Sequence, residues 1–370
     1  MEQFLVVTLG VANFTNGTVV PANSPGSGLE AGKVVLVLFL GSLTLLTVLL
    51  NGGVMAAICT TKKLHIPANY LICSLAATDF LVAVLVMPLS IMYVVMGKWP
   101  LGQAICEAWL SLDMTCCTCS ILHLCAIALD RYCAITNAVR YAYKRTARRA
   151  YVMVGAVWAI STLISIPPLF WRYGGNSSSD HCIIKHDHIG YTLYSTVGAF
   201  YAPLAIILAL YFRIFRVVKA LCQNRRCAWR PNSSRMSLNQ NSLGHCPNSE
   251  LSTSDPTADL SRADGTPEAA TQLETGRDRA GERARIYLSR ERKAARTLGL
   301  ILGAFVLCWL PFFLKELLVG LGLVNDSELL CNTLTWLGYV NSLINPLLYT
   351  SFNEDFKHAF RRMLRCEGRV

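Results

Sequence analysis

Two carboxylates lie within long apolar runs of the sequence, where an ionisable side chain is costly and by default indicates a functional site. Asp113 stands about two helical turns inside its run, and Cys117 and Ser120 follow at i+4 and i+7 on the same helical face. An acid there suits a ligand with one positive charge, because a pair about 4 Å apart gains on the order of 4 kcal/mol before desolvation at an effective dielectric near 20. The alternative is an ion pair with a cation of another run, but no Lys or Arg lies at that depth.

Aromatic and hydroxyl side chains could enclose a ligand at Asp113, because aromatic faces suit both an ammonium group and a flat ring. An aromatic stripe ending in an acid occurs at i, i+3, i+4 and i+7, formed by Trp309, Phe312, Phe313 and Glu316. Such a stripe alone is more often helix packing, whereas acid, stripe and hydroxyls together favour a binding cavity. Side chains of two further runs could complete that cavity, namely Tyr339, Ser195 and Thr196.

Asp79, the second acid, lies deeper in its run. Its candidate oxygen neighbours are Ser120, Asn341 and Asn345, a set that suits a small cation. The alternative is a neutral, hydrogen-bonded acid. His123 is the one histidine within a run, and we expect it to be a hydrogen-bonded core residue.

The apolar runs that carry these residues predict an all-α membrane protein with seven transmembrane helices. The chain is 53% hydrophobic and 15% charged, against roughly 25% charged residues in a soluble domain. The runs are close to the roughly 20 residues that span a bilayer as a helix, and they cover residues 34–59, 68–94, 104–133, 149–170, 190–215, 297–321 and 329–350. We expect an N-terminal arm over 1–33, the seven-helix domain over 34–350 with a disordered cytoplasmic loop at 223–288, and a tail over 351–370.

Basic residues predict the orientation, because connections rich in Lys and Arg stay in the cytoplasm. They concentrate in alternate connections and in the tail, which places the N-terminus outside the cell, in the plasma membrane. This asymmetry accounts for most of the net charge of +11, so we expect no nucleic-acid partner. Glycosylation sequons fall on the predicted outside at Asn13, Asn16 and Asn176, and also at Asn325. No cleavable signal peptide is evident, and the first run is expected to act as the signal anchor.

The tail and the cysteines give further expectations. Residues 352–365 alternate apolar and basic side chains at helical spacing, which predicts an amphipathic helix on the inner membrane surface. Cys366 after it is either a palmitoyl site or an ordinary thiol. Most of the 15 cysteines lie inside runs, and only Cys106, Cys182 and Cys331 fall near the oxidising exterior. A bridge between Cys106 and Cys182 would pin an outer loop over the bundle.

The sequence resembles the rhodopsin-like, class A G-protein-coupled receptors over nearly its whole length. The resemblance rests on motifs in the family's order, namely Asn51, Leu75–Asp79 (LAATD), Asp130, Arg131 and Tyr132, Trp158, Pro203, Cys308–Pro311 (CWLP), and Asn345, Pro346 and Tyr349 (NPLLY). Asp113 seven residues after Cys106, with Ser195, Thr196 and Tyr339, is similar to the aminergic branch.

Within that branch the sequence resembles the type-1 serotonin receptors, subtype E first and subtype F next. The stretches that carry this likeness include Ala56–Leu64, Asp113–Leu122, Cys182–His188, Arg290–Ala295 and Leu334–Val340. Cys133 departs from the subgroup, which usually has an aromatic residue after Asp-Arg-Tyr, and this puts the detail of the cytoplasmic contact in doubt.

The resemblance implies roles by position. Asp113 would pair with the serotonin ammonium beside Cys117, and the Cys106–Cys182 bridge is expected. Ser195 and Thr196 would face the indole, while Ala199 stands where catecholamine receptors usually have another serine. Flanking and rim residues would be Trp309, Phe312, Phe313, Tyr339 and Glu316.

The same resemblance implies that Asp79, Ser120 and Asn341 bind an allosteric sodium ion, and no other cofactor is expected. It also implies a switch. Arg131 would be held at rest by Asp130 and Glu291, and the other switch residues would be Tyr132, Asn345, Pro346 and Tyr349. The implied partners are an inhibitory Gi/Go protein that lowers cyclic AMP, then arrestin and receptor kinases. The protein is expected not to be an enzyme. Two rivals remain, a receptor for another biogenic amine and a transporter or channel, although the inverted repeats or broken helices of transporters are not found.

Overall fold

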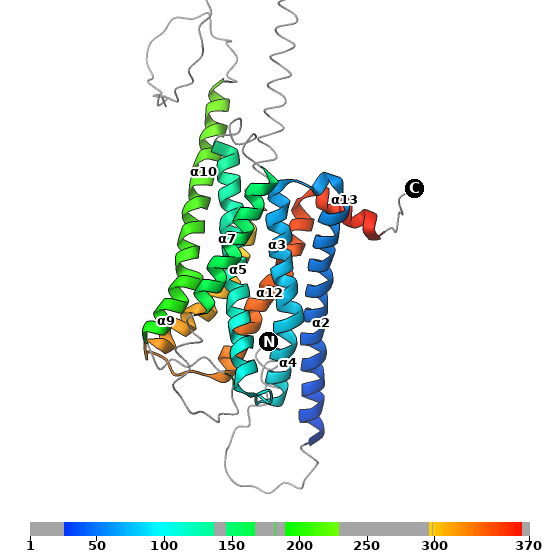
Figure 1. Ribbon diagram of the computed structural model, residues 1–370, viewed down its shortest axis with the longest axis vertical. Coiled ribbons are helices and arrows are strands. Elements are labelled where there is room, and N and C mark those ends of the chain that lie inside the picture. The colour runs from blue at the N-terminus through cyan, green and yellow to red at the C-terminus, as the bar shows by residue number, and fades with distance from the viewer. Residues whose placement is uncertain are drawn as a thin grey trace, which may run out of the picture. The chain divides into compact units, whose positions relative to one another are not determined.

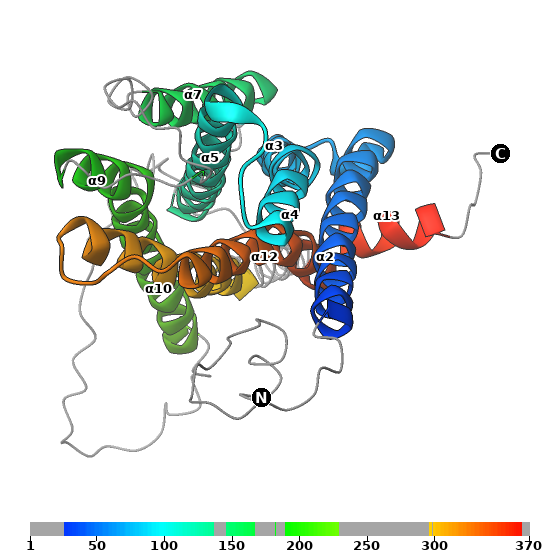
Figure 2. The ribbon, with the colours of Figure 1, turned by 90° about the horizontal axis from the view of Figure 1, so that it is seen from below.

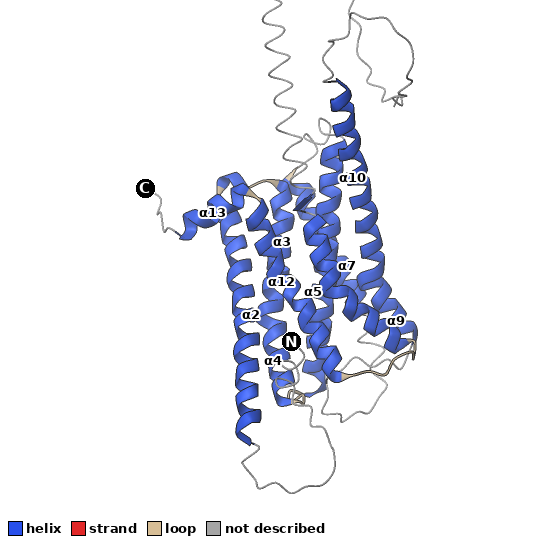
Figure 3. Ribbon diagram, turned by 180° about the vertical axis from the view of Figure 1, so that it is seen from behind, coloured by secondary structure: helices blue, strands red, loops and turns tan. Residues whose placement is uncertain are grey.

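The computed structural model describes residues 26–136, 146–166, 182, 189–228, 296, 297 and 299–364. Within these residues every regular element is helical, as Figure 3 shows. The chain divides into two compact units, one of residues 1–215 with 294–370 and one of residues 216–293. Of the second unit the described part is residues 216–228, which are helical. The helical bundle belongs to the first unit.

The bundle consists of long helices that run side by side (Figures 1 and 2). In chain order the elements are α2 (Gly26–Thr60), η1 (Lys62–Leu64), α3 (Pro67–Leu81), η2 (Val82–Val86), α4 (Met87–Met96), α5 (Gly102–Thr136), α7 (Ala147–Ser165), α9 (Ile189–Thr196), η3 (Val197–Tyr201), α10 (Ala202–Ala228), a helix over Gly299–Gly320 that we call helix 299–320, α12 (Glu328–Phe352) and α13 (Glu354–Leu364). The helix α5 packs against α3, α7 and both π-helical turns, η2 and η3, so it lies at the centre of the bundle.

Five helices of the described chain are long and apolar enough to cross a membrane, judged by length and composition: Ala31–Thr60, Pro67–Met96, Gly102–Thr136, Thr192–Ala220 and Gly299–Gly320. The other two predicted spans correspond to α7, which packs on α3 and α5, and α12, which packs on α2 and α3. Leu38, Leu163 and Leu307 on the bundle surface are 66 to 74% exposed. Apolar side chains so open are unfavourable in water and suit a lipid surrounding.

Proline explains two irregular turns in these helices, because it lacks the N–H that the helical ladder needs. The π-helical turn η2 precedes Pro88, and the π-helical turn η3 precedes Pro203. A third proline, Pro346, is accommodated inside the continuous helix α12. Two of the polar side chains of α5 bond to carbonyls near these turns. Trp109 Nε1 donates to the Val86 carbonyl at 3.1 Å, and the Cys125 thiol donates to the Pro203 carbonyl at 3.4 Å. The irregular turns are thereby fixed against the central helix.

Buried polar side chains join the helices at specific points. Asn51 of α2 donates to the Ser342 carbonyl of α12 at 3.0 Å. His123 Nδ1 lies 2.8 Å from the Cys119 carbonyl, which can only accept, so Nδ1 carries the proton of the neutral ring. Nε2 then accepts from the Ser74 hydroxyl at 2.8 Å, and that hydroxyl accepts from Trp158 Nε1 at 3.1 Å. The prediction of a hydrogen-bonded core histidine is confirmed.

The amphipathic helix predicted in the tail is α13, which lies beside the end of α2 (Figures 1 and 2). Its apolar side is buried at Phe356 and Ala359, whereas Arg361 and Arg362 are exposed. Phe360 packs so close to Gly53 of α2 that a Cβ there would lie 2.9 Å from the phenyl ring. Gly53 therefore allows the close approach of α13.

Two helices extend beyond the predicted apolar runs. The first helix begins at Gly26, inside the segment 1–33 that was expected to be the N-terminal arm. The fifth helix continues to Ala228, past position 223 where the cytoplasmic loop was expected to begin. The added turns contain polar, Gly or charged residues that give no hydropathy signal, yet they hold no proline that would stop a helix. Hydropathy locates the membrane core, not the full length of each helix.

Candidate ligand-binding site

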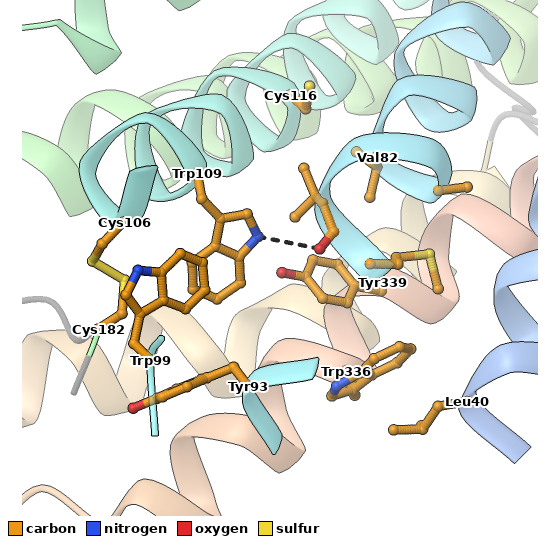
Figure 4. Packing of buried hydrophobic residues seen from close by; sticks show 13 residues of the cluster. Leu40, Val82, Tyr93, Trp99, Cys106, Trp109, Cys116, Cys182, Trp336 and Tyr339 are labelled. Carbon is orange, nitrogen blue, oxygen red and sulfur yellow. Dashed lines mark hydrogen bonds between the residues drawn. A yellow bond between two sulfur atoms is a disulfide. The ribbon is translucent and has the colours of Figure 1, made fainter. Parts of the chain in front are cut away.

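The disulfide between Cys106 and Cys182 defines one end of the bundle, which we call the disulfide end. The Cα atoms of the two residues are 5.7 Å apart, and both side chains are buried. Beside it, the Trp99 and Trp109 rings stack at 5.0 Å, and Tyr93 meets Trp109 edge to face at 6.3 Å (Figure 4). The disulfide expected from the family resemblance is confirmed. It packs in one buried cluster with the three aromatic rings.

Asp113 lies one helical turn after Trp109 in α5 and has two neutral partners. Tyr339 of α12 donates its hydroxyl proton to Asp113 Oδ2 at 3.0 Å, and the Cys117 thiol donates to Oδ1 at 3.5 Å. Within the part of the chain that the structure describes, no Lys, Arg or His forms an ion pair with Asp113. The carboxylate oxygens retain lone pairs for a further donor, so among the described residues Asp113 has no cation as a partner.

The aromatic stripe of helix 299–320 forms a connected set of rings. The Trp309 and Phe312 rings meet edge to face at 5.9 Å, and Phe312 meets Phe313 in the same way at 5.3 Å. Phe313 stacks on Phe200 of η3 at 4.4 Å, a contact that sequence reasoning missed. Gly338 of α12 packs against Trp309, since a Cβ there would lie 2.7 Å from the indole ring. The tryptophan is thus held next to Tyr339, the partner of Asp113.

The hydroxyls expected at the site occupy the last turn of α9. Ser195 and Thr196 both donate their protons to the Thr192 carbonyl, at 3.1 and 2.7 Å. Their oxygens therefore present lone pairs rather than protons to a ligand. Ala199 is buried one turn later in η3 and offers no polar atom.

Glu316 is buried at the end of the aromatic stripe and has a cation beside it. The Lys315 ammonium lies 3.0 Å from Glu316 Oε1 and 2.6 Å from Asp326 Oδ1. Sequence reasoning assigned Glu316 to the pocket rim and missed Lys315, although the neighbouring positions of opposite charge were a visible signal.

Asp79 is fully buried between α3, α5 and α12. Its Oδ1 accepts from Ser342 at 2.9 Å and from Ser120 at 3.4 Å, and its Oδ2 accepts from Asn345 at 2.9 Å. The structure thus brings together Ser120 and Asn345 as expected, and adds Ser342, which shares a helical face with Asn345.

The same region contains amide oxygens without partners. Among the described residues, the buried Oδ1 atoms of Asn51, Asn341 and Asn345 accept no hydrogen bond. A buried oxygen without a donor is costly in a protein interior. Carboxylate, hydroxyl and amide oxygens are the ligands that hard cations prefer. The residues present therefore fit a sodium ion.

The switch residues are only partly covered by the described chain. Asp130 is buried at the opposite end of α5, and Arg131 and Tyr132 are half-buried beside it. Asn345 and Pro346 lie in α12. Outside the described residues or side chains lie the predicted switch positions Glu291 and Tyr349, the sequons Asn13, Asn16 and Asn176, and Cys366. Cys331 is half-buried and unbridged, and Asn325 is exposed in the connection before α12.

Comparison with known proteins covers the residues around both Asp113 and Asp79. Residues 50–349 match the 7 transmembrane receptor (rhodopsin family). The 5-hydroxytryptamine receptor 1E of Cavia porcellus is 59% identical over 342 residues, which are 90% of this chain and 93% of that receptor. The Homo sapiens 5-hydroxytryptamine receptor 1E is 58% identical over the same shares, and the Homo sapiens 5-hydroxytryptamine receptor 1F is 54% identical over 343 residues, again 90% and 93%.

Proposed function

The chain belongs to the rhodopsin family of seven-transmembrane receptors, and from this premise we propose that it is a serotonin receptor that signals through inhibitory G proteins. It is an all-α, multi-pass membrane protein, whose seven-helix bundle is followed by the amphipathic helix α13. Its relatives are receptors, not enzymes. In the plasma membrane the disulfide end faces outside, where a bridge is stable.

The observation that carries this proposal is the carboxylate of Asp113, which has neutral partners and an aromatic surrounding. Serotonin carries one ammonium group, which would pair with Asp113 while Tyr339 keeps the carboxylate in place. The Trp309 and Phe312 rings offer π faces to the ammonium and to the flat indole. An acid whose partners among the described residues are neutral supports a ligand that brings its own positive charge.

The hydroxyls of α9 support an indole more than a catechol. Serotonin has two ring donors, an indole N–H and a hydroxyl, and the Ser195 and Thr196 oxygens can accept from them because their own protons go to Thr192. A catechol would need a further polar group one turn on, where Ala199 is buried and apolar. The names of the relatives, 5-hydroxytryptamine receptors, support the same ligand.

Signalling requires that the ligand shift a population of conformations. Asp113, Trp309 and Tyr339 come from three different helices, so a ligand that binds them better in one arrangement of the helices would favour that arrangement. Arg131, near the other end of α5, would be released from its resting contacts to meet the G protein. Exposed basic residues such as Arg213 and Arg296 suit that partner.

A sodium ion would be held by Asp79, with Ser120 and Asn341 as further ligands. The ion would supply a positive charge that balances the buried carboxylate. The chain's own residues would orient that carboxylate, since Ser342 and Asn345 each donate to it. Asn341, whose Oδ1 accepts no bond from the described residues, is buried one turn before Asn345 and is suited to ligation.

A cyclic AMP assay across a panel of biogenic amines tests the proposal. Cells that express the receptor should lower stimulated cyclic AMP at the lowest concentration with serotonin, and pertussis toxin should abolish the response. Untransfected cells are the control. If dopamine, tyramine or histamine acts at a lower concentration than serotonin, the chain is a receptor for another amine. An amine-dependent current or uptake that persists with toxin would favour a transporter or channel.

A further inference from the structure

Gly320 lies in the last turn of helix 299–320 and packs directly against α9. A Cβ added at Gly320 would lie 2.6 Å from Thr192 Oγ1 and 2.7 Å from Thr192 Cβ, and it would overlap Thr192 Cγ2. Thr192 is itself buried. Figures 1 and 2 show α9 beside this end of helix 299–320. The two helices approach this closely because position 320 carries no side chain.

Thr192 cannot make room by rotating its side chain. Rotation about χ1 moves Oγ1 and Cγ2, and a β-branched residue in a helix has few rotamers. The Cβ atom stays where the backbone places it. An alanine at position 320 would therefore require the two backbones to move apart, until the distance between the two Cβ atoms grows from 2.7 Å to at least the 3.4 Å of ordinary contact.

A second contact holds the same two segments together further along α9 and η3. Phe200 of η3 stacks on Phe313 of helix 299–320 at 4.4 Å and on Phe305 of the same helix at 5.9 Å. Phe200 is fully buried and follows Thr192 by about 12 Å along the helix. Helix 299–320 thus fixes α9 and η3 at two levels, Thr192 and Phe200.

The two candidate ligand hydroxyls lie between these levels. Ser195 and Thr196 donate to the carbonyl of Thr192 itself, at 3.1 and 2.7 Å, so a displacement of Thr192 carries both hydroxyls with it. Because Phe200 acts as the pivot, the hydroxyls would move about half as far as Thr192, away from the aromatic rings of helix 299–320. A hydrogen bond to a ligand held by those rings weakens steeply with such a shift.

We propose that Gly320 is a positioning residue, which sets the spacing between helix 299–320 and α9 and so places Ser195 and Thr196 within reach of the ring hydroxyl of serotonin. The inference rests on the proposed function, because it takes these two oxygens to accept from the ring of serotonin. It adds that their reach is set by a glycine of the opposite helix that need not touch the ligand.

The test compares serotonin with tryptamine, which lacks only the ring hydroxyl. Competition against radiolabelled serotonin on intact cells gives both affinities. In the wild type serotonin should bind more tightly, because its hydroxyl adds a hydrogen bond. In Gly320→Ala this preference should fall about fivefold, the contribution of one hydrogen bond. The controls are Gly303→Ala in the same helix and Gly190→Ala in α9, where an added Cβ meets no atom within 4 Å and the preference should be kept.

Paired variants show whether the change comes from the spacing of the helices. Thr192→Gly removes the three atoms that an alanine at position 320 would meet and keeps the carbonyl that orients the hydroxyls. Adding Gly320→Ala to Thr192→Gly should therefore leave the preference as in Thr192→Gly alone. Adding Gly320→Ala to Thr192→Ser should still lower it, because the Cβ atom remains. A role of Gly320 in general packing would weaken both amines together and leave the preference unchanged, which would overturn the inference.

Two further outcomes are decisive. Equal affinities of serotonin and tryptamine for the wild type would show that α9 does not read the ring hydroxyl, and would overturn the inference. If Gly320→Ala does not reach the cell surface, the pair with Thr192→Gly should reach it and keep the preference. Absence of that pair from the surface, where Thr192→Gly alone is present, would contradict the packing argument. If neither amine binds the wild type, the proposed function fails instead.

Discussion

The substitution Asp113→Asn removes one negative charge from the candidate site and keeps the size of the side chain. Tyr339 can still donate to the amide oxygen, as it does to Oδ2 at 3.0 Å, so the link between α5 and α12 is retained. The ligand ammonium, however, loses its counter-charge. A pair at about 4 Å and an effective dielectric near 20 is worth about 4 kcal/mol, of which we take about 3 kcal/mol to remain after desolvation. The affinity for serotonin should therefore fall by about 100-fold.

Saturation binding of radiolabelled serotonin, with receptor amounts matched by surface labelling, measures this loss. Cys117→Ala is the control, because it removes the other partner of Asp113 but leaves the charge. A neutral hydrogen bond contributes about 1 kcal/mol, so the control should lose less than about tenfold. An affinity of Asp113→Asn within threefold of the wild type, at normal surface expression, would refute the role of Asp113 as the amine partner.

Three further predictions concern packing and ions. Gly338→Ala should destabilise the purified receptor by about 1 to 3 kcal/mol, because the added Cβ would lie 2.7 Å from Trp309. Gly303→Ala meets no atom within 4 Å and should keep the melting temperature or raise it slightly, since Ala favours a helix more than Gly does. Equal melting temperatures of the two variants would contradict this packing. Ser74→Ala should cost about 1 to 3 kcal/mol by leaving Trp158 Nε1 and His123 Nε2 without their shared partner, while Ser42→Ala, at an exposed hydroxyl, should be nearly neutral in the same melting assay. Asp79→Asn should make agonist affinity insensitive to the replacement of sodium by N-methylglucamine, and a sodium effect as large as in the wild type would exclude Asp79 as an ion ligand.

Hydropathy predicted the fold well because lipid imposes one requirement on every span, a long apolar helix. The same reasoning could not place helix ends. The turns at Gly26 and those leading to Ala228 extend beyond the apolar core, and helix formation there depends on backbone propensity instead of burial. The π-helical turns η2 and η3 were also not predicted, although Pro88 and Pro203 mark their positions.

The candidate site was predicted in its members but not in its contacts. Helical periodicity placed Asp113 and Cys117 on one face, yet the bond from Tyr339 depends on how α5 and α12 are packed, which a single sequence does not contain. The partners of Lys315 show the same limit, since Asp326 lies in a connection whose path no periodicity describes. Ser342 was missed at Asp79 for a related reason. The sequence marks the amides of α12 as oxygen ligands, whereas the Ser342 hydroxyl makes one of the two shortest bonds to Asp79.

The central claim is that serotonin acts on this chain to activate an inhibitory G protein. Guanine-nucleotide exchange on a purified inhibitory G protein, with the receptor in lipid nanodiscs, tests it most directly. Serotonin should accelerate exchange in a saturable manner with the wild type, and the Asp113→Asn variant should need about 100-fold more serotonin for the same rate. Exchange that serotonin does not accelerate, in a preparation that melts cooperatively, would contradict the account.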